Sequence, residues 1–484
     1  MKLFGKILAP LRLAIRHRLH PSQLVVLSFA LVILIGSVLL YLPVSTAPGS
    51  RIRYVDALFT AVSATCVTGL VVVDTGTVFS VFGQLVILGC IQIGGLGLMT
   101  FTTVFMASFG YRLAITDRIA IQESFHHTPM GKLGTLIKYI VIATLITEAI
   151  GALLLAVYWI VVERFESVGQ TVYHAIFHSV SAFCNAGFSL YPDNMMGFQG
   201  DAVVQLITAA LIIAGGLGFL VGLDIKEYLQ QRLFHRYWSR AVRERVESIR
   251  PRARLSVHTR LVLISTLILL VIGTVSYYFL ERRGAFSGMG FGTAWMNAFF
   301  CAVTPRTAGF NTIDYAQFGG PALLCTMVLM FIGANPGSCG GGIKTSTFGL
   351  LVAYSISRWR GYQRLHLFGR TVPQESIDKG AAVVVAAVAL IIIASSALML
   401  TETRGTTAAE SQREMLGILF ETISAFGTVG LSLGQTLILT DPGKLIVSAV
   451  MFIGRTGPLT LALAIRLKQR REHYRFAEEN IMVG

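Results

Sequence analysis

The sequence predicts an all-α membrane protein of four repeats, each a membrane span, a re-entrant loop and a second span, arranged around one pseudo-fourfold axis. Three observations predict this fold. The chain is 54% hydrophobic and only 13% charged. Apolar stretches of membrane-spanning length recur along the chain, and a short motif occurs four times between them. Basic residues gather at alternate ends of the apolar stretches.

The apolar stretches favour membrane spans over the buried core helices of a large soluble protein. A helix needs about 20 apolar residues to cross a hydrocarbon core of about 30 Å, and most of these stretches reach that length. The first stretch is too long for the core of a secretory signal, so it is interpreted as the first span. The stretches are Leu24–Leu42, Val78–Phe109, Tyr139–Val162, Val203–Leu223, Leu261–Phe279, Leu323–Ile332, Ala381–Leu400 and Leu445–Ile465.

The net charge of +15 comes from basic clusters at alternate span ends. This positive-inside pattern predicts an even number of spans with both termini in the cytoplasm. Nucleic-acid binding by the basic stretch 226–260 is the disfavoured alternative, because the charges follow the span ends. The clusters are Lys2, Lys6, Arg12, Arg16 and Arg18 in the N-terminal arm, residues 226–260, residues 357–370, and Arg466, Lys468, Arg470, Arg471 and Arg475 in the tail.

The repeated motif runs from a Phe to a Gly followed by Leu or Phe. Its copies are FTAVSATCVTGL from Phe59, FHSVSAFCNAGF from Phe177, FFCAVTPRTAGF from Phe299 and FETISAFGTVGL from Phe420, aligned without gaps. Ser-Ala precedes the Gly in three copies, and Val303-Thr304 stands in the third. The glycines are Gly69, Gly187, Gly309 and Gly430, at near-constant spacing.

Each copy sits between two spans and is too short to cross, so it must enter and leave on one face. Non-helical backbone at membrane depth is tolerated only where it is buried in protein or lines water. Four copies around one axis meet that condition and form a cation pore. Short helices then point their negative ends at the axis, and the following carbonyls replace the hydration shell of an ion. Gly supplies the required φ values. Four extracellular loops left by an old duplication are the alternative.

The motif and the spans divide the chain into eight segments. These are a cytoplasmic N-terminal arm (1–20), repeat 1 (21–110), repeat 2 (111–232), a basic cytoplasmic loop (233–258), repeat 3 (259–358) with an intramembrane gate loop (333–346), a cytoplasmic loop (359–378), repeat 4 (379–466) and a cytoplasmic tail (467–484).

Glycines recur in the span after each motif, at Gly94, Gly95 and Gly97, at Gly215, Gly216 and Gly218, at Gly333 and at Gly454. In the first two copies they indicate either close helix approach or a pore-lining role. The third copy, GANPGSCGGGIKTS from Gly333, cannot form a regular helix, because it contains Pro and many glycines. It is not a nucleotide P-loop, because Ile343 separates Gly342 from Lys344 and no strand precedes it.

We interpret this broken segment as a mobile gate below the filter, with a static kink as the alternative. The gate residues are Gly337, Gly340, Gly341, Gly342 and Lys344. Arg455 aligns with Gly95 and Gly216, so it is predicted to lie just below the filter and to reduce cation occupancy there. A lone Arg at mid-span costs about 2.5–3.5 kcal/mol and normally faces a cavity, and snorkelling to an interface is the alternative.

The remaining candidates for chemistry are sparse. The six cysteines are Cys66, Cys90, Cys184, Cys301, Cys325 and Cys339. They form no CxxC pair, which favours packed free thiols. An enzyme would need converging acids, bases or metal ligands, but Glu148 is the sole acidic residue well inside a predicted span. An alternating-access transporter is also disfavoured, because such folds often use inverted repeats, whereas these repeats run parallel.

With these motifs in view, the chain resembles the Trk/Ktr/HKT superfamily of potassium transporters from about Pro21 to Arg470, and within it most resembles the membrane subunits of the bacterial Ktr system. The motifs that carry the resemblance are CVTGLVVVDT from Cys66, SAFCNAGFS from Ser181, TPRTAGFNTID from Thr304, GGGIKTSTF from Gly340 and SAFGTVGLS from Ser424. Together they are specific, although no single one would be.

The resemblance implies four membrane–pore-loop–membrane repeats around a pseudo-fourfold pore, a filter with one Gly per repeat, the gate loop in repeat 3 and a pore Arg at Arg455. Members with Ser at the first filter Gly favour sodium, so Gly69 implies potassium. The implied filter positions are Val67, Thr68 and Gly69, then Asn185, Ala186 and Gly187, then Thr307, Ala308 and Gly309, and finally Thr428, Val429 and Gly430.

The resemblance also implies the setting of the protein. The chain would be a non-enzymatic, multi-pass protein of the bacterial cytoplasmic membrane, in contact with lipid, working as a homodimer. It would dock on a cytosolic ring of nucleotide-binding regulatory subunits of the KtrA or TrkA kind. We expect potassium as the transported ion, sodium as an implied coupling ion, no cofactor bound by this chain and no nucleic-acid partner.

Overall fold

The computed structural model describes residues 21–96, 133–237, 255–404 and 407–457. The predicted N-terminal arm, the C-terminal tail and most of the basic 233–258 loop lie outside these residues, as does the boundary between repeats 1 and 2 at 110–111. The described residues form an almost entirely helical protein, with one two-stranded hairpin. The expectation of an all-α membrane fold therefore agrees with the structure.

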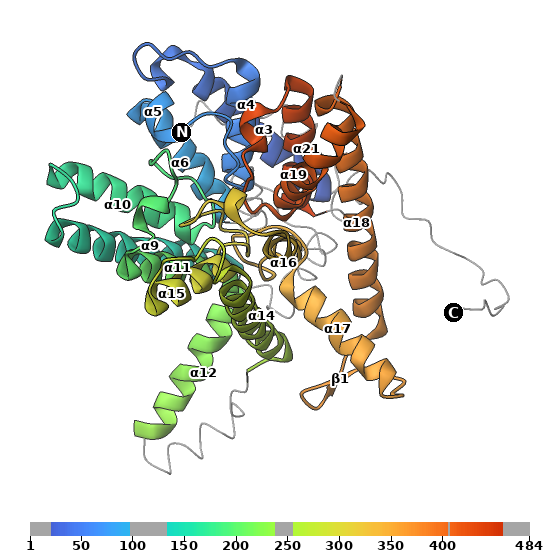
Figure 1. Ribbon diagram of the computed structural model, residues 1–484. Helices are drawn as coiled ribbons and strands as arrows, with labels where there is room; N and C mark the ends of the chain where they lie inside the picture. The colour runs from blue at the N-terminus through green and yellow to red at the C-terminus, as the bar shows by residue number, and fades with distance from the viewer. Residues whose placement is uncertain (1–20, 97–132, 238–254, 405–406, 458–484) are drawn as a thin grey trace, which may run out of the picture.

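The helices fall into four groups that follow one another in the chain around a common centre (Figure 1). The first group is α3 (Pro21–Tyr41), α4 (Tyr54–Cys66), α5 (Thr75–Val78) and α6 (Val81–Gly95); the second is α9 (Leu133–Val161), α10 (Val168–Phe183), α11 (Ala202–Leu217) and α12 (Phe219–Tyr237); the third is α14 (Val257–Glu281), α15 (Phe291–Val303), α16 (Gly320–Phe331) and α17 (Thr345–Trp359); the fourth is α18 (Gln374–Glu402), α19 (Ala408–Gly427), α20 (Gln435–Ile438) and α21 (Asp441–Thr456).

Short elements connect these helices. Three 3₁₀ turns lie at Pro43–Ser45, Met196–Phe198 and Tyr315–Gln317, each in the loops between longer helices. The strands β1 (His366–Leu367) and β2 (Arg370–Thr371) pair as an antiparallel hairpin between α17 and α18. The hairpin lies in the segment that the sequence analysis assigned to a cytoplasmic loop.

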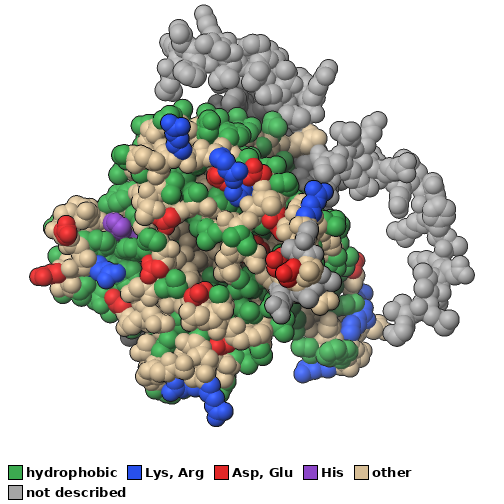
Figure 2. Space-filling view, turned by 45° about the horizontal axis from the view of Figure 1, so that its top comes forward, with side chains coloured by type: hydrophobic (Ala, Val, Ile, Leu, Met, Phe, Trp, Pro, Cys, Tyr) green, Lys and Arg blue, Asp and Glu red, His purple; other side chains and the backbone are tan. Residues whose placement is uncertain are grey.

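The outer helices have the length and surface of membrane spans. The segments Ile137–Val161, Val257–Glu281 and Gln374–Glu402 are each long and apolar enough to cross a membrane. Their exposed side chains include Leu153 on α9 at 63% and Leu400 on α18 at 75% exposure. Hydrophobic side chains cover much of the visible flanks (Figure 2). Such wide apolar surfaces cannot face water, so the structure supports a multi-pass membrane protein.

One predicted span is wrong as a single helix. The stretch Val203–Leu223 breaks at Gly218, where α11 and α12 meet at 95°. Gly218 has φ of +94°, and an added Cβ there would approach the carbonyl oxygen of Pro336 to 2.6 Å. The hydropathy pattern did not indicate this break, because the residues on both sides of it are apolar. A glycine with positive φ ends a helix regardless of hydrophobicity.

The helices that end in the repeated motif, α4, α10, α15 and α19, are called the ring helices below. The long helix that follows each motif packs against the ring helix of the next group. In this cycle α6 contacts α10, α11 contacts α15, α16 contacts α19, and α21 returns to α4. The phenylalanines Phe59, Phe177, Phe300 and Phe420 on the ring helices are at most 1% exposed. The core therefore surrounds the ring helices, and the chain closes on itself.

The ring helices begin several residues before the first Phe of their motif. They contain 13, 16, 13 and 20 residues. α19 begins with a capping box in which Thr407 and Glu410 satisfy each other's backbone N–H groups. The added turns are partly polar, so an apolar run could not reveal them.

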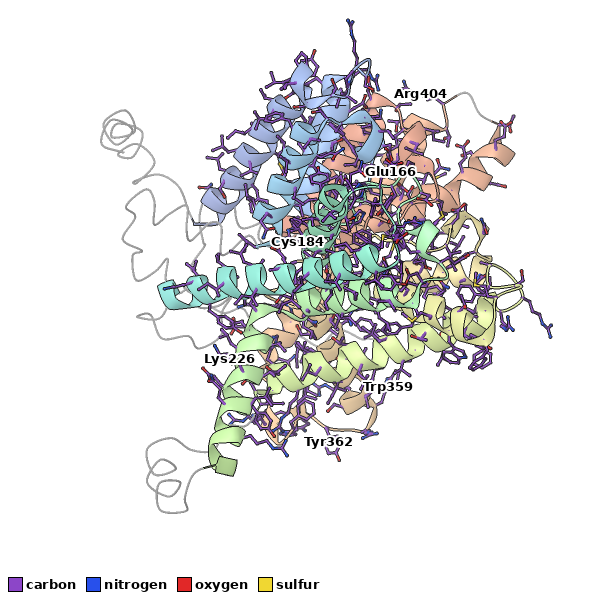
Figure 3. All side chains as sticks on the ribbon, turned by 90° about the vertical axis from the view of Figure 1, so that its left-hand side faces the viewer. Glu166, Cys184, Lys226, Trp359, Tyr362 and Arg404 are labelled. Carbon is purple, nitrogen blue, oxygen red and sulfur yellow. The ribbon has the colours of Figure 1, made fainter. Side chains whose placement is uncertain are left out.

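The two ends of the molecule differ in their side chains. Lys226 on α12, Trp359 at the end of α17 and Tyr362 just after it lie at one end. Arg404 lies at the other end, with Cys184 between them (Figure 3). The two basic segments predicted to be cytoplasmic, around residues 226 and 357–370, thus begin at the same end of the molecule.

Candidate functional site

The four motif glycines, Gly69, Gly187, Gly309 and Gly430, lie together in one closed ring. On each glycine, an added Cβ would come within 3.0 Å of the carbonyl oxygen of the residue before the next glycine in cyclic order. Because the fourth contact returns to the first repeat, the glycines surround one axis rather than lying scattered. The contacts run from Gly69 to Ala186, from Gly187 to Ala308, from Gly309 to Val429 and from Gly430 to Thr68.

The short non-helical segments that contain the ring glycines are called the ring strands, and they share an unusual backbone. The four glycines have φ between +70° and +93°, and the residue two positions before each glycine is also left-handed. Non-glycine residues rarely adopt positive φ, and each such residue stores about 1–3 kcal/mol of strain. The alternation of positive and negative φ turns successive carbonyls toward the same side. The strained residues are Val67 at +57°, Asn185 at +60°, Thr307 at +72° and Thr428 at +50°.

Each ring helix ends three to six residues before the ring glycine of its repeat. The helices end at Cys66, Phe183, Val303 and Gly427. The negative end of each helix dipole therefore lies beside the ring. Together with the carbonyl oxygens, these ends create a site that favours a cation.

Buried hydroxyls near the ends of the ring helices hold the strands. In the first and fourth repeats, the Ser63 and Ser424 hydroxyl oxygens accept hydrogen bonds from the Gly69 and Gly430 backbone N–H groups, each at 3.1 Å. Both serines are fully buried. These bonds fix the ring glycines to their own helices.

The second and third repeats use the hydroxyl differently. Ser181 donates to the Phe188 carbonyl at 2.7 Å, and Thr304 donates to the Phe310 carbonyl at 2.5 Å. The carbonyl after the ring glycine is therefore held in these two repeats by a side chain from the ring helix. The ring thus has two kinds of support, one in repeats 1 and 4 and another in repeats 2 and 3.

The gap-free alignment of the third copy is wrong in its first half. The fully buried Phe is Phe300, whereas Phe299 is only partly buried. Thr304 donates to the carbonyl after its glycine as Ser181 does in the second copy, although Thr304 stands one residue closer to its glycine, Gly309. The stretch from the hydroxyl residue to the ring glycine is therefore one residue shorter in the third copy, which an alignment without gaps cannot show.

Three glycines, one each on α6, α11 and α21, allow these helices to approach the ring helices closely. An added Cβ on any of them would strike a carbonyl oxygen in the last turn of the ring helix of its own repeat. The structure thus favours close approach, one of the two alternatives for these residues. The contacts join Gly94 to Thr65, Gly215 to Phe183 and Gly454 to Phe426.

The predicted gate loop is an extended, largely buried segment. No helix occurs between the end of α16 at Phe331 and the start of α17 at Thr345. Ile332 and Ile343 form a parallel bridge, and the Thr345 N–H donates to the Ala334 carbonyl at 3.3 Å. The two ends of the loop therefore lie side by side, which does not fit a simple kink in a continuous helix.

The middle of the gate loop lies against the ring strands. The Gly341 N–H donates to the Thr428 hydroxyl at 3.0 Å. An added Cβ on Gly340 would strike the Thr307 hydroxyl. Lys344 does not point away from the loop, because its amine donates to the Gly340 carbonyl at 2.8 Å. The glycines thus permit the loop to pass directly beside two residues that precede ring glycines.

The loop is also tied to the break between α11 and α12. The Asn335 backbone N–H and its amide both approach the Gly216 carbonyl, at 3.2 and 3.0 Å. In return, the Phe219 N–H donates to the Gly337 carbonyl at 2.9 Å. The gate loop therefore contacts the second and fourth repeats in addition to its own.

Arg455 links the gate loop to the first repeat. Its guanidinium donates to the Cys339 carbonyl in the loop and to the Gly94 carbonyl on α6. The side chain is only 8% exposed, so it does not snorkel to an interface. Within the described part of the chain, its hydrogen-bond acceptors are backbone carbonyls rather than carboxylates. A full positive charge thus lies buried beside the gate loop.

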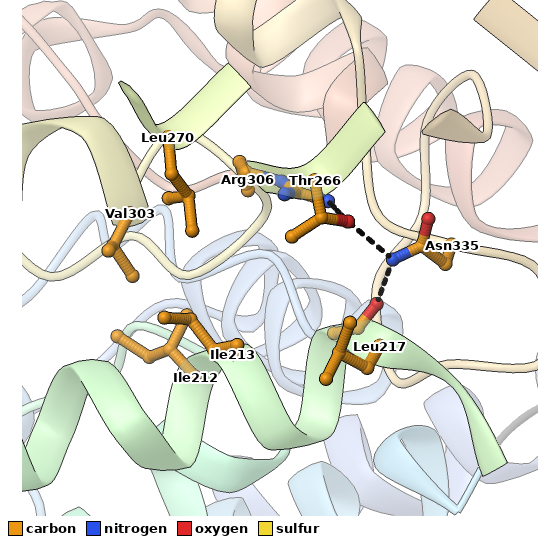
Figure 4. A pocket seen from close by; sticks show the side chains of 9 residues that line it. Ile212, Ile213, Leu217, Thr266, Leu270, Val303, Arg306 and Asn335 are labelled. Carbon is orange, nitrogen blue, oxygen red and sulfur yellow. Dashed lines mark hydrogen bonds between the residues drawn. The ribbon is translucent and has the colours of Figure 1, made fainter. Parts of the chain in front are cut away.

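A second buried guanidinium, Arg306, was not assigned a role from the sequence. It donates to the Thr266 hydroxyl at 3.3 Å and to the Thr345 hydroxyl at 3.1 Å. Thr266 also accepts from the Asn335 amide at 3.4 Å. Figure 4 shows the contacts among Arg306, Thr266 and Asn335 at the edge of a small cavity between α11 and α14. Arg306 therefore contacts Thr345 at the end of the gate loop directly, and Asn335 near its start through Thr266.

A buried ion pair joins the fourth repeat to the first. The Lys444 amine on α21 lies 2.6 Å from the Asp56 carboxylate on α4, and both side chains are about nine-tenths buried. Arg53 contacts Asp56 and Asp441 as well. Breaking a buried pair by removing one partner typically costs 3–5 kcal/mol. Its members lie far apart in sequence, so no local pattern identifies it.

The structure offers no enzyme-like cluster in the part of the chain it describes. The six cysteines are free thiols, as expected, and five of them are buried. No group of three or more His, Cys, Asp or Glu side chains that could hold a metal ion occurs among the described residues. Glu148 is buried, with hydrogen bonds from Gln92 at 3.1 Å and Cys184 at 3.6 Å. It contributes to packing between α6, α9 and α10.

Comparison with known proteins gives consistent matches over the whole chain. The family model TrkH, described as a cation transport protein, matches residues 13–474. The Ktr system potassium uptake protein B of Bacillus subtilis is 38% identical over 469 residues, which cover 96% of this chain and 97% of the relative. The protein of the same name from Vibrio alginolyticus is 40% identical over 465 residues, covering 96% and 94%.

Two further matches extend this comparison. The potassium/sodium uptake protein NtpJ of Enterococcus hirae is 36% identical over 473 residues, which cover 97% of this chain and 98% of the relative. The solved structure of the potassium transporter TrkH from Vibrio parahaemolyticus matches with a TM-score of 0.68 at 20% identity, covering 91% of this chain and 84% of that one. The structural match supports the helical fold described above.

Proposed function

The chain belongs to the TrkH family of cation transport proteins, and we propose that it takes up potassium through a filter formed by the glycine ring. The cyclic contact of Gly69, Gly187, Gly309 and Gly430 carries this proposal. Four strands with alternating φ direct backbone oxygens toward one axis, and such oxygens replace the hydration shell of an ion. The names of the Bacillus and Vibrio relatives support potassium as the ion.

The filter comprises the ring glycines and the two residues before each of them. We place the ion among the carbonyl oxygens of these four strands, which form four membrane–pore-loop–membrane repeats around a pseudo-fourfold pore. The closed packing of the ring helices and the buried hydroxyls near their ends support this arrangement. The strands are Val67–Gly69, Asn185–Gly187, Thr307–Gly309 and Thr428–Gly430.

The gate loop and Arg455 form the closed barrier below the filter in this proposal. The loop contacts Thr428 and the strand before Gly309 from one side. Arg455 ties the loop to α6 and adds a positive charge that opposes cation entry. Opening would require the loop to leave these contacts.

Deleting Gly337–Lys344 is expected to raise potassium flux. The deleted residues include Gly341, which donates to the Thr428 hydroxyl, and Cys339, whose carbonyl accepts from Arg455. The deletion removes the barrier while it leaves the ring glycines in place. Flux per membrane-inserted protein, measured in vesicles, checks this prediction, and an unchanged flux would argue against a gate.

The setting of the protein follows from the family in the same way. We propose that the chain works in the bacterial cytoplasmic membrane as a homodimer, with both termini in the cytoplasm, and that a cytosolic ring of nucleotide-binding subunits regulates it. The Ktr system names of the relatives support a partner component. The potassium/sodium name of the Enterococcus protein supports sodium coupling. The chain itself binds no cofactor in this proposal.

Growth rescue of a bacterium that lacks its own potassium uptake systems tests the proposed function. The full chain should restore growth at low potassium, and an added regulatory partner should strengthen the rescue. Growth with and without sodium then shows whether sodium is coupled to uptake. A membrane-inserted chain that neither rescues growth nor carries potassium in vesicles would refute the proposal.

A further inference from the structure

The side chain of Asn194 contacts two filter strands at once. Its amide nitrogen is 3.4 Å from the Gly187 carbonyl oxygen and 3.4 Å from the Gly309 carbonyl oxygen. Both oxygens accept from the same amide group, and they belong to adjacent repeats. Asn194 therefore bridges the second and third strands of the glycine ring.

The loop holds Asn194 firmly in this place. Its φ of +57° is a left-handed value that Asn tolerates better than most residues. The Ser189 hydroxyl donates to the Asn194 carbonyl at 3.0 Å, and the next residue, Met195, donates its N–H to the Asn311 carbonyl at 3.1 Å. The loop after the second strand is thus fastened to the loop after the third.

The amide can take only one orientation. If it were reversed, the Asn194 side-chain oxygen would face two carbonyl oxygens, which repel it, whereas the nitrogen offers one hydrogen to each. The side-chain oxygen is buried without a hydrogen-bond partner in the described part of the chain. The bridge to the two glycine carbonyls therefore determines how this amide is oriented.

The ring is asymmetric as a result. Among the described residues, no side-chain donor reaches the carbonyl of Gly69 or Gly430, so two of the four glycine oxygens are free of such bonds. A hydrogen bond from an amide draws charge from a carbonyl oxygen and fixes its direction. An ion at this level meets two free oxygens and two held ones.

We propose that Asn194 is a specificity-determining positioning residue, which holds the Gly187 and Gly309 carbonyls so that the cation site prefers potassium over sodium. This inference rests on the proposed function, because it assigns a role within the same filter. A ring whose oxygens are fixed in position fits the larger ion, whereas freed oxygens can move inward around the smaller one. Asn194 acts through the carbonyls and does not itself need to touch the ion.

Two substitutions remove the donor while they keep the backbone. Asn194→Asp is isosteric and tolerates positive φ, but its carboxylate cannot donate. Asn194→Gly also tolerates positive φ and has no side chain. A net hydrogen-bond contribution of about 1 kcal/mol corresponds to a change of about fivefold in a binding constant. We expect the ratio of sodium to potassium half-saturation concentrations in uptake to fall by about fivefold in both variants.

Asp193→Asn serves as the matched control, because Asp193 is the exposed neighbour in the same loop. It should leave the ratio as in the unmodified protein. If both Asn194 variants carry potassium with an unchanged ratio, the proposal is overturned. If the unmodified chain itself carries no potassium, the proposed function fails first, so the two failures are distinguishable.

A second measurement applies to variants that insert into the membrane but do not carry ions. The thermal midpoint of the purified protein in detergent is followed while KCl or NaCl is added separately. The unmodified protein should be stabilised at lower potassium than sodium concentrations, because an ion that binds the folded state raises its stability. This preference should shrink in Asn194→Asp and Asn194→Gly. Variants that keep the full preference would refute the role of Asn194 without any uptake data.

Discussion

Replacing Gly430 by Ala is expected to reduce potassium uptake about 100-fold or more. The added Cβ would strike the Thr68 carbonyl oxygen and approach Gly69 Cα to 3.0 Å. Both atoms belong to the backbone of the neighbouring strand, so they cannot rotate away as a flexible side chain could. A displaced carbonyl no longer coordinates the ion. A loss of about 2.8 kcal/mol in the stabilisation of the ion corresponds to a reduction of about 100-fold.

Gly434→Ala is the matched control for strain. Gly434 lies in the same loop with φ of +90°, close to the +93° of Gly430, but an added Cβ meets nothing within 4 Å. Both substitutions therefore impose similar backbone strain, of about 1–2 kcal/mol. Only Gly430→Ala changes the ring.

Uptake is measured per amount of protein in the membrane, so that poor folding is not mistaken for a filter defect. Gly434→Ala should lower the amount of folded protein somewhat and leave uptake per molecule close to normal. If both variants lose uptake equally, backbone strain in the loop would explain the result, and the ring contact would not be needed. Gly69→Ala, which faces the Ala186 carbonyl, should behave like Gly430→Ala.

The ring was predictable because its signal is local and repeated. A glycine that must adopt positive φ, preceded by a buried hydroxyl and a buried Phe, leaves the same trace in each copy. The one-residue offset in the third copy was missed, since Phe299 and Phe300 are both phenylalanine and sequence offers no reason to prefer the second. Burial of Phe300 resolves this choice only in three dimensions.

The contacts between repeats were beyond sequence reasoning. Asn194 lies in a loop whose composition predicts only a turn, and its two partners lie in different strands. Arg306 was visible in the motif, but its link to Thr345 depends on how the gate loop folds back. The break at Gly218 was hidden for another reason, because hydropathy measures burial and not backbone direction. Periodicity and composition report the environment of a residue, whereas these features depend on which distant residue is its neighbour.

Arg455→Gln is expected to increase potassium flux by about tenfold or more. The substitution removes a buried positive charge and the guanidinium fork that joins the Cys339 carbonyl to the Gly94 carbonyl. Hydrogen bonds from a charged group contribute about 1.5–3 kcal/mol each, and the loss of one such bond corresponds to a factor of at least about ten. Gln is shorter and neutral, so it can neither span both carbonyls nor repel a cation.

Arg455→Lys separates the two effects. Lys keeps the charge but presents a single ammonium instead of a planar fork. If the charge forms the barrier, flux in Arg455→Lys should remain near normal, and if the tether to the gate loop forms it, flux should rise toward that of Arg455→Gln. Equal or lower flux in Arg455→Gln, at the same amount of inserted protein, would contradict both.

Combining Arg455→Gln with the deletion of Gly337–Lys344 shows whether the two act on one barrier. Arg455 donates to Cys339, which the deletion removes, so the tether cannot contribute once the loop is gone. The potassium flux of the double variant should then exceed that of the deletion variant only by the effect of the Arg455 charge on the ion. The two increases in flux should therefore not multiply. Fully multiplicative increases would mean that Arg455 and the gate loop restrict the ion at separate places along its path, although the structure joins them by a hydrogen bond.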